Sequence, residues 1–400
     1  MLVNPTRASV DVARPDPLFW RGRRVLLTGH SGFKGSWLTL WLLRLGADVY
    51  GVSLPPDASV PLWQGLDLES AEHLKGRLRT AWIDIADADA LNAYVSAVQP
   101  EVVFHLAAQP LVRRGYAEPV LTWCTNVLGT IHLLEALRRL LSPCSLVAIT
   151  TDKVYANREW EHGYREPDPL GGYDPYSSSK AAAELAIASW RDSFCGDAPH
   201  QKSDLTIASV RAGNVIGGGD WSADRIVPDL IRALAGGSTL QLRSPASTRP
   251  WQHVLEPLAA YLLLAERLSG HRPTTQSCDS PERFTTSFNI GPPLSSNRSV
   301  LELVQAALPH WPGATADVVK LDPAAVSEPH EASLLHLSSD RAHHRLGWRP
   351  LWDFSTTVAH TMAWYHRHHQ LSAAGPVPAA ALQSLCLEQI EAYLASSPCS

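Results

Sequence analysis

A tyrosine and a lysine four residues apart, Tyr176 and Lys180, are the side chains whose types and spacing most directly suggest chemistry. Residues at this spacing share one face of a helix. A tyrosine side chain has a reference pKa of about 10 and is a poor base near neutral pH, but a nearby positive charge favours its phenolate. The pair can therefore remove a proton from an alcohol while a hydride leaves the same carbon. Because Tyr-x-x-x-Lys is common by chance, its weight comes from its place at the start of a predicted helix that follows a predicted strand.

A second group of reactive side chains, Thr150, Thr151, Asp152 and Lys153, comes at the end of a predicted strand. Ligands of open α/β sheets bind beyond the carboxyl ends of the strands, where two adjacent ionisable side chains are unusual. We expect the hydroxyl of Thr150 or of Thr151 to hydrogen-bond a substrate oxygen beside Tyr176. The alternative is that Asp152 and Lys153 are an ordinary solvated pair in a loop.

The segment 28–35, with the sequence TGHSGFKG, is a glycine-rich turn between a predicted strand and a predicted helix. Glycines allow a sharp turn and a close approach of the backbone to a pyrophosphate, and a helix N-terminus adds free N–H groups and partial positive charge. The spacing Gly-x-x-Gly-x-x-Gly is typical of short-chain dehydrogenase-type sheets. In the alternative interpretation the glycines serve the turn alone. The predicted dinucleotide site includes Gly29, Ser31, Gly32, Phe33, Lys34 and Gly35.

The sequence leaves the choice between NAD and NADP open. The end of the second predicted strand, 51–54, carries no acid that would hold the adenosine ribose, and the next acid is Asp57. Lys34 lies inside the glycine turn and could meet a 2′-phosphate. Asp84 and Ile85 follow the third strand, where a carboxylate beside an apolar side chain suits the adenine amino group. A simple helix cap is the alternative for Asp84.

The elements that must position these residues alternate between strands and helices. Apolar runs predict strands at 24–28, 47–54, 80–85, 102–106, 145–150 and 205–210. Helical periodicity predicts helices at 36–45, 87–98, 119–140 and 176–194. Near-continuous apolar strands indicate a parallel sheet covered on both faces. With right-handed crossovers this gives an α/β fold, a Rossmann-like doubly wound parallel sheet.

The pattern becomes irregular after about residue 213, which predicts a smaller mixed α/β domain for the substrate. Its expected elements are strands at 239–242 and 287–290 and helices at 225–235, 256–268 and 299–308. A further helix is expected at 380–395. We therefore divide the chain into a flexible leader (1–18), a dinucleotide-binding domain (19–213), a mainly substrate-binding domain with segments interleaved with the first (214–370) and a C-terminal tail (371–400).

Composition excludes several classes of protein. The chain has 400 residues, of which 45% are hydrophobic and 18% charged, as in globular proteins. A net charge of −5 provides no basic field for nucleic acid, and we find no apolar run of the roughly 18 residues that a membrane span needs. Six scattered cysteines without a Cys-x-x-Cys pair and the lack of a secretory signal favour a reduced, cytoplasmic protein. We expect no metal, because the histidines at 366–369 are typical of a solvated helix face.

These motifs together resemble the extended short-chain dehydrogenase/reductase (NAD-dependent epimerase/dehydratase) superfamily, and within it the sugar-nucleotide 4,6-dehydratases. The resemblance runs from about Phe19 to Tyr365 and leaves out the leader and the C-terminal tail. It is highly specific because five blocks occur in order. They are GHSGFKGSW (29–37), TDKVY (151–155), GGYDPYSSSK (171–180), GNVIGGGDW (213–221) and RPWQHV (249–254).

The resemblance implies a redox-neutral lyase reaction on a nucleotide sugar bound beside NAD. Tyr176 would remove the 4-hydroxyl proton while NAD⁺ takes the C4 hydride, and the new 4-ketone would acidify the C5 proton. Water would then be eliminated across C5 and C6, and the hydride would return to C6. Asp152 is implied as the general acid that protonates the departing 6-hydroxyl, a task that a raised pKa suits.

Lys153 departs from one branch of the resembled family. The related thymidine-diphosphate enzymes carry Asp-Glu at this place and use the Glu as the C5 base, whereas here Lys153 follows Asp152. This fits the cytidine-type branch and implies CDP-glucose as the substrate. Lys153 is then either the C5 base, which requires a lowered pKa, or a group that orients others electrostatically.

Further binding residues are implied by the same resemblance. Asn214 and Arg249 match positions that hold the diphosphate, for which a guanidinium has the right charge and geometry. The implied cofactor contacts are Leu106, Ala107, Ala108, Asn126 and Thr150, besides Tyr176 and Lys180. The implied substrate contacts are Gln109, Arg113, Asn214, Arg225, Arg249 and His330. Weaker candidates are Trp251, His253 and Asn289.

Two other functions compete with the dehydratase. A nucleotide-sugar 4-epimerase of the same superfamily needs only the Tyr–Lys pair, so Asp152 favours elimination. A non-catalytic dinucleotide-binding protein is disfavoured by the intact set of Thr151, Tyr176 and Lys180. In the resembled enzymes, helices equivalent to 119–140 and 176–194 pair with a second subunit, which implies a homodimer or a dimer of dimers.

Overall fold

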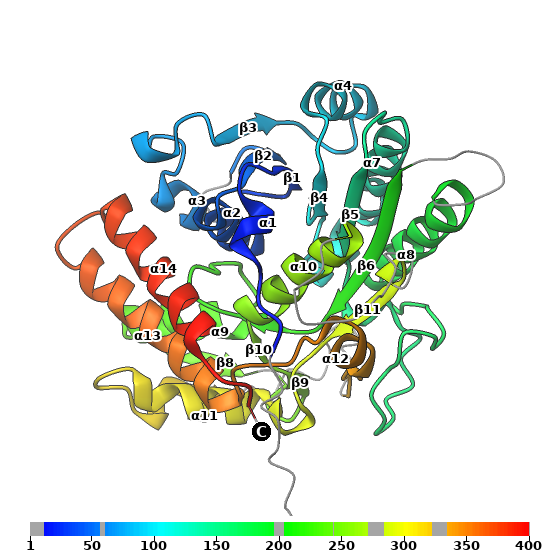
Figure 1. The fold of residues 1–400 in the computed structure, drawn as a ribbon. Coiled ribbons are helices and arrows are strands. Elements are labelled where there is room, and N and C mark those ends of the chain that lie inside the picture. Colours follow the sequence, from blue (N-terminus) through cyan, green and yellow to red (C-terminus); the bar gives the residue numbers. More distant parts are fainter. Residues whose placement is uncertain are drawn as a thin grey trace, which may run out of the picture.

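The centre of the molecule is a seven-stranded parallel sheet. The structure is a computed structural model that describes residues 12–56, 61–195, 204–242, 244–270, 284–321 and 334–399. All neighbouring strands of the sheet run parallel, and the sheet is clearly twisted in Figure 1. From one edge to the other the strands are β3 (Leu78–Trp82), β2 (Asp48–Ser53), β1 (Arg24–Thr28), β4 (Val102–His105), β5 (Cys144–Ile149), β6 (Leu205–Ala212) and β11 (Ser287–Ile290). This arrangement confirms the predicted Rossmann-like class.

The strand order places the binding crevice. The chain proceeds outward from β1 to β3, returns to β4 on the other side of β1, and then proceeds to the opposite edge. The order therefore reverses between β1 and β4, and in open α/β sheets ligands bind at such a point. The glycine turn follows β1, and the segment 106–109 follows β4, so both lie at this reversal.

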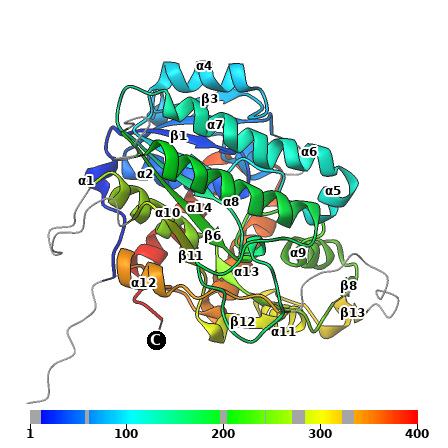
Figure 2. The ribbon, with the colours of Figure 1, turned by 90° about the vertical axis from the view of Figure 1, so that its right-hand side faces the viewer.

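Helices cover both faces of the sheet, as the two views show (Figures 1 and 2). The strand β1 alternates accordingly, because Val25 and Leu27 belong to the core on one face and Leu26 to the core on the other. On the first face lie α1 (Pro17–Trp20), α2 (Phe33–Leu45), α3 (Pro61–Leu66), α10 (Leu255–Leu268) and α14 (Ala379–Ala395). On the second face lie α4 (Ala88–Val98), α5 (Val112–Ala117), α6 (Pro119–Trp123), α7 (Gly129–Arg138) and α8 (Pro175–Phe194).

Short elements beyond the carboxyl edge of the sheet form the rest of the fold. Three two-stranded pairs, β7–β10, β9–β12 and β8–β13, lie there with the helices α9, α11 and α13. The bounds are β7 (Val215–Ile216), α9 (Ile226–Gly236), β8 (Leu240–Leu242), β9 (Thr248–Pro250), β10 (Gln252–His253), β12 (Asn297–Ser299), α11 (Val300–Ala307), β13 (Val319–Leu321), α12 (Asp340–Leu346) and α13 (Phe354–Ser372).

Two segments assigned to the second domain belong physically to the sheet. The strand at 287–290 is β11 and pairs with β6, while α10 packs on β5 and β6. Strand and helix were each predicted near their observed positions, but their partners are far away in the sequence and cannot be identified from local periodicity. The exact domain boundaries remain a prediction.

The ends of the described chain are fixed to the body of the molecule. Near the N-terminus, the backbone N–H of Asp16 donates to Glu266 of α10 at 2.8 Å. Near the C-terminus, α14 packs against α2, α3 and α13. Residues 12–18 of the leader are therefore packed, although we expected a flexible leader, and the helix expected at 380–395 is observed as α14.

The helix predicted at 119–140 is interrupted. It consists of α6, a π-helical turn at Cys124–Leu128 and α7. By length and hydropathy the stretch Pro119–Arg138 could cross a membrane, which corrects our count of apolar runs. In this fold it packs against α4 and α8, and a core helix passes the same test.

Candidate active site

The glycine turn allows the backbone of Gly29 to lie close to the backbone of the loop that follows β4. Gly29 has φ +74° and donates its N–H to Val52 O at 2.7 Å. A Cβ at Gly29 would stand 2.7 Å from the backbone nitrogen of Ala107, so a side chain cannot be accommodated. The helix α2 begins at Phe33 after Gly32, which has no side chain to cap the first N–H groups. Those groups remain directed at the crevice and fit a pyrophosphate.

Ser53 occupies the end of β2, where an acid would hold the adenosine ribose. Its hydroxyl bonds Nδ1 of His30 at 2.8 Å, and the His30 ring stacks on Trp82. Burial lowers the pKa of His30 to about 4, so this ring is neutral at physiological pH. The end of β2 is therefore uncharged, which leaves the choice between NAD and NADP open here.

Asp84 and Ile85 follow β3. Asp84 is exposed and accepts the backbone N–H of Ala86 at 2.9 Å, which supports the turn before α4. The cap of α4 is instead Asp87, which accepts Ala90 N. Ile85 is buried against α7, since a Cβ at Gly129 would stand 2.6 Å from its Cδ1. Contact of either residue with adenine remains a prediction.

The charges that act on Lys34 favour a place at the reactive end of the crevice over one at a 2′-phosphate. Burial lowers the pKa of Lys34 to about 8, and the charges that act on it next are those of Arg225, Asp152, Lys180 and Asp220. All four lie at the reactive end of the crevice. Lys34 points there because it is in the first turn of α2, whose N-terminus faces the sheet's carboxyl edge.

A chain of buried hydrogen bonds joins the glycine turn to the second helical layer. Thr28 Oγ1 bonds His105 Nδ1 at 2.7 Å, and His105 Nε2 bonds Thr130 Oγ1 at 3.0 Å. Thr130 in turn donates to Asn126 O at 2.7 Å. Burial is the main cause that lowers the pKa of His105 to about 3, so the ring is neutral. The loop 106–108 is held against the turn by two bonds to Thr28, from Leu106 N and Ala107 N.

Asn126 lies in the π-helical turn and connects two functional segments. Its Nδ2 donates to Ser179 Oγ of α8 at 2.9 Å, and its Oδ1 accepts Gln109 N at 2.8 Å. The side chain of Gln109 is turned into its own loop, where it bonds Leu111 and Thr122. Asn126 thus links the loop after β4 to the catalytic helix, and contact of Asn126 or Gln109 with a ligand stays a prediction.

Tyr176 and Lys180 lie in the first turns of α8, as predicted. The helix starts sharply because Asp174 accepts Ser177 N at 3.0 Å and Pro175 occupies the first helical position. Both side chains are buried, and Lys180 Nζ donates to Ile149 O at the end of β5 at 3.3 Å. Burial lowers the pKa of Lys180 to about 8, against the opposing effect of Glu184.

Thr151, not Thr150, lies beside the Tyr176 phenol. A side-chain hydrogen bond to Thr151 lowers the pKa of Tyr176, but burial outweighs it and raises that pKa to about 12. The protein groups alone therefore leave the phenol protonated, and the phenolate that we expect beside the lysine and a positive nicotinamide ring stays a prediction. The Thr150 hydroxyl points away and donates to Glu184 Oε1 at 2.6 Å. The hydroxyl beside Tyr176 is therefore that of Thr151, and the hydroxyl of Thr150 is excluded from this contact.

Asp152 is buried at the same place. Its Oδ1 accepts the Thr151 hydroxyl at 3.0 Å, while Oδ2 is buried and has no hydrogen-bond partner among the residues that the structure describes. Burial raises the pKa of Asp152, and the charges of Lys153, Arg249 and Lys34 oppose the shift. A buried carboxyl with a raised pKa and a free oxygen can donate a proton. Lys153 is half-buried next to it.

The predicted substrate residues divide into two groups. Arg225 bonds Asp220 at 2.9 Å and acts on the pKa of Tyr176, while Arg249 is buried and acts on that of Asp152, so both lie at the reactive centre. Arg113 is exposed and pairs with Asp224 at 3.4 Å at the rim.

Asn214 is half-buried beside β10, where its carbonyl accepts Gln252 N. His330 and Asp57 lie outside the described residues.

The weaker candidates have structural partners. Trp251 Nε1 donates to Arg298 O at 2.9 Å, the buried His253 packs against Trp352, and Asn289 bonds Tyr155. The histidines of α13 are not simply solvated, because His366 and His369 contact the ring of Trp311 and His368 stacks on Trp364.

Sequence reasoning missed Glu184, Arg211 and His105, which support the site from behind. Glu184 lies four residues after Lys180, and therefore on the same helix face. That spacing was a usable signal. The position of Arg211 on β6 and that of His105 on β4 gave none, since both lie within apolar strands.

The chain is similar to known proteins over most of its length. The family model described as GDP-mannose 4,6 dehydratase matches residues 26–361. A CDP-glucose 4,6-dehydratase from Salmonella typhimurium is 42% identical over 350 residues, covering 88% of this chain and 92% of the relative. A dTDP-glucose 4,6-dehydratase from Streptomyces griseus is 30% identical and covers 89% of this chain and 99% of its own length.

Among solved structures, the fold is similar to that of a dTDP-glucose 4,6-dehydratase from Streptomyces venezuelae with NAD and TYD bound. The TM-score is 0.69 at 24% identity, with coverage of 87% of this chain and 98% of the other. At this identity the likeness concerns the fold. It agrees with the predicted doubly wound sheet and its covering helices.

Proposed function

This chain belongs to the GDP-mannose 4,6-dehydratase family, and from this we propose that it is a hydro-lyase that converts CDP-glucose to CDP-4-dehydro-6-deoxyglucose and water. The observation that carries the proposal is the acid beside the phenol: Asp152 is buried with a raised pKa and a free Oδ2, and it bonds the same Thr151 that lies at Tyr176. Elimination of water requires such an acid, and simple oxidation does not.

The side chains can perform the proton transfers in order. Tyr176 takes the proton of the 4-hydroxyl, with Thr151 holding the same oxygen. The resulting 4-ketone acidifies the C5 hydrogen. Asp152 then gives its proton to the 6-hydroxyl, which leaves as water from C6 while C5 is deprotonated. Lys153 is our candidate for the C5 base, because it adjoins Asp152 closely enough to act on its pKa.

The cofactor we propose is NAD. When bound, it accepts the C4 hydride and returns it at C6, so the cycle consumes no reductant. The chain's own contribution is the glycine turn, the uncapped start of α2 and the neutral end of β2 at Ser53. Lys180, four residues after Tyr176 on α8, contributes a positive charge on the same helix face, and the charge of Arg225 lowers the pKa of Tyr176.

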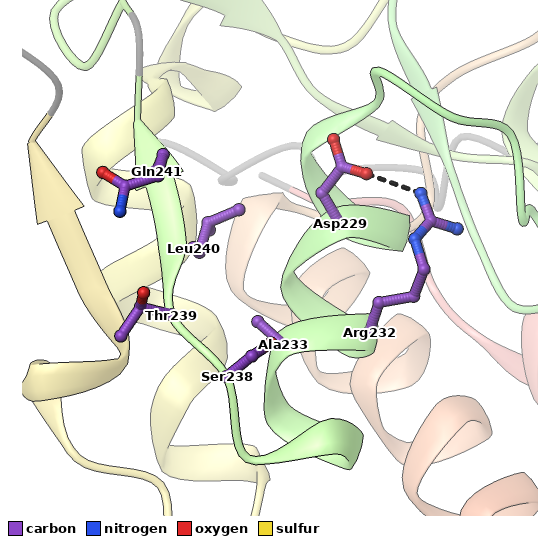
Figure 3. A pocket seen from close by; sticks show the side chains of 7 residues that line it. All are labelled: Asp229, Arg232, Ala233, Ser238, Thr239, Leu240 and Gln241. Carbon is purple, nitrogen blue, oxygen red and sulfur yellow. Dashed lines mark hydrogen bonds and ion pairs between the residues drawn. The ribbon is translucent and has the colours of Figure 1, made fainter.

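A pocket beyond the reactive centre supports an extended substrate. It is lined by α9 and by β8 with the residues before it (Figure 3). Asp229 and Arg232 lie there, four and seven residues after Arg225 on α9, which is about 6 and 10 Å along the helix axis. A hexose at Tyr176 with its diphosphate at Arg225 and Arg249 would direct its nucleoside toward this pocket. Its lining residues are Asp229, Arg232, Ala233, Ser238, Thr239, Leu240 and Gln241.

Cytidine is the base we propose. The curated relative of 42% identity acts on CDP-glucose according to its name, and Lys153 stands where the thymidine-type enzymes of the resembled family carry glutamate. The proposal includes a cytoplasmic location and no nucleic-acid or membrane partner, in keeping with a net charge of −5.

A homodimer, alone or paired into a dimer of dimers, is part of the proposal. Large apolar side chains are exposed along α6, the π-helical turn and α8, on the open side of the second helical layer. Val120 is 74% exposed and Leu185 is 62% exposed. Exposed apolar groups on neighbouring helices favour burial against a second copy.

The decisive experiment combines the purified chain with CDP-glucose. We expect a 4-keto product, detected by its ultraviolet absorbance in alkali, and loss of the C6 hydroxyl by mass spectrometry. Asp152→Asn should retain C4 oxidation, seen as reduced cofactor, and lose product. Interconversion of 4-epimers without loss of water would favour the epimerase, and substrate binding with no chemistry in the wild type would refute both enzymes.

A further inference from the structure

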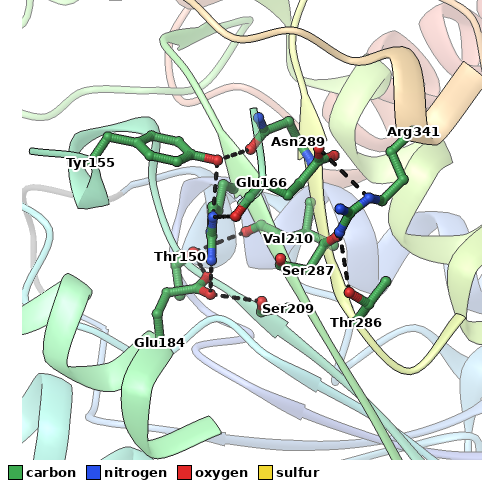
Figure 4. A network of polar contacts seen from close by, with 11 residues as sticks. Thr150, Tyr155, Glu166, Glu184, Ser209, Val210, Thr286, Ser287, Asn289 and Arg341 are labelled. Carbon is green, nitrogen blue, oxygen red and sulfur yellow. Dashed lines mark hydrogen bonds and ion pairs between the residues drawn. The ribbon is translucent and has the colours of Figure 1, made fainter. Parts of the chain in front are cut away.

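A buried ion pair behind the catalytic residues has no part in the reaction just proposed. Arg211 Nη2 of β6 and Glu184 Oε2 of α8 are 2.7 Å apart, and the side chains are 5% and 3% exposed. The pair belongs to a polar network with Thr150, Tyr155 and Ser209. Figure 4 labels Glu184 together with these three residues.

The pair is costly as a purely structural element. Removing two charges from water is expensive, and apolar residues of similar size often replace a buried ion pair without loss of stability. Glu184 is nevertheless ionised, because Arg211 and the hydroxyls of Thr150 and Ser209 hold its pKa below its usual value despite burial. The cost indicates a role other than stability, which a functional test can identify.

The network holds both ends of the segment 150–155. At one end, the Thr150 hydroxyl donates to Glu184 Oε1 at 2.6 Å. At the other end, Arg211 Nη1 donates to the Tyr155 hydroxyl at 2.9 Å, and that hydroxyl donates to Asn289 Oδ1 at 2.7 Å. Thr151, Asp152 and Lys153 lie between these two anchors, so the one ion pair fixes the segment that carries them.

The same pair is fixed to the catalytic helix. Glu184 lies one helical turn after Lys180 and two turns after Tyr176, on one face of α8. Its negative charge raises the pKa of Lys180, against the burial that lowers it. Lys180 also interacts with Lys34 of α2, which is positive, and with His105 of β4, which is neutral, and its Nζ donates to Ile149 O of β5.

We propose that the Glu184–Arg211 ion pair positions the segment 150–155 against Tyr176 and Lys180, and that Glu184 supplies the negative charge that balances the Lys180 ammonium. This deepens the proposed function and rests on it for the reaction that is measured. Glu184 and Arg211 are positioning residues, since neither touches the reacting atoms.

Three variants separate the two roles. Glu184→Gln keeps an oxygen for Thr150 and removes the charge. The double variant Glu184→Met, Arg211→Met removes both charges and leaves no unpaired ion, so it remains informative where Glu184→Gln does not fold. Tyr155→Phe releases the far end of the segment and keeps the charge at Lys180. Glu266→Gln, a buried glutamate of α10 that bonds Trp20, is the matched control.

We expect kcat to fall about 100-fold in the double variant, because small misplacements of reacting groups cost that much. The KM for CDP-glucose should change little. The pH at which kcat declines on the basic side of its pH profile should fall by about one unit or more, because loss of a nearby negative charge lowers the pKa of Lys180. Tyr155→Phe should lower kcat without moving that limb, and Glu266→Gln should change neither.

A second readout does not require turnover. The pH dependence of Lys180 carbamylation by cyanate, followed by mass spectrometry, reports when the amine loses its proton. The midpoint should lie near 8 in the wild type and lower in both Glu184 variants. An unmoved midpoint with wild-type kcat would overturn the inference even if the chain is the proposed dehydratase. A moved midpoint in a chain that leaves CDP-glucose unchanged would refute the proposed function alone.

Discussion

Gly213 lies directly beneath the carboxyl group of Asp152. A Cβ built on Gly213 would stand 3.0 Å from Asp152 Oδ2 and 3.0 Å from Cγ of Pro250. The backbone there is not in the left-handed region, so the requirement for glycine is one of space. The oxygen that a methyl group would displace is the one free to donate the proton.

Gly213→Ala should therefore impair elimination more than oxidation. We expect formation of the 4-keto-6-deoxy product to slow by about 10- to 100-fold, while reduced cofactor still forms in a single turnover. Gly236→Ala is the control, because a Cβ at Gly236 meets nothing within 4 Å. Equal losses of both half-reactions would show that the methyl group disturbs more than Asp152.

Lys34 gives a prediction about cofactor preference. Its charge acts among Asp152, Arg225 and Lys180, so Lys34→Met should leave the ratio of NAD to NADP affinity unchanged and raise the KM for the nucleotide sugar. Because Lys34 opposes the raised pKa of Asp152, its loss should raise that pKa further. Asp152 then stays protonated to higher pH, and the pH at which kcat declines through loss of this proton should rise. Selective loss of NADP binding would restore the 2′-phosphate assignment.

The fold and the reactive pair were accessible from the sequence because their signals are local. Apolar runs, turns and helical periodicity predicted the strands β1 to β6 within a few residues, and the spacing of Tyr176 and Lys180 placed them on one helix face. The predicted family and dehydratase activity are confirmed by a family model that matches residues 26–361 and a CDP-glucose 4,6-dehydratase of 42% identity.

What the sequence could not provide depends on partners distant along the chain. The resembled enzymes have an asparagine that stabilises a kink at the place of Asn126, but the periodicity of this stretch is helical throughout. The π-helical turn and the bonds of Asn126 to Gln109 and Ser179 came only from the structure. Likewise, two adjacent threonine side chains point to opposite sides of an extended backbone. Only the position of Glu184 on α8 shows that the side chain of Thr150 is the one that points away from the active site.

The proposed dimer predicts that a single surface substitution on α8 separates the two subunits and leaves the fold of each intact. Leu185→Glu places a charge on the exposed apolar face of α8, and burying it against a second copy would be unfavourable. We expect a smaller mass in analytical ultracentrifugation, with the far-ultraviolet circular dichroism unchanged. Leu294→Glu, at a residue of similar exposure (67% against 62%) away from α6 and α8, should keep the wild-type mass. A wild-type chain that sediments as a monomer would contradict the dimer itself.

Two buried glutamates of α10 predict how stability depends on pH. Glu256 accepts the N–H groups of Leu351 and Trp352 and the Tyr393 hydroxyl, and Glu266 accepts Trp20 Nε1. Burial raises the pKa of Glu256 to about 7 and that of Glu266 to about 8. Both values exceed that of the unfolded chain, about 4.3.

At pH values between the unfolded-state pKa and the folded-state pKa of each glutamate, the folded chain binds more protons than the unfolded chain. Stability from these groups is complete below the unfolded pKa of about 4.3 and is lost as pH rises from there to about 7 for Glu256 and about 8 for Glu266, with a slope of up to about 1.4 kcal/mol per pH unit for each. We expect the Tm to fall over this range, less steeply in Glu266→Gln, measured by scanning calorimetry. Glu302→Gln should leave the slope unchanged, because Glu302 is exposed and its pKa is lowered by the cap at Ser299, so it is ionised in both states. A slope equal in all three proteins would mean that Glu266 is charged in the fold.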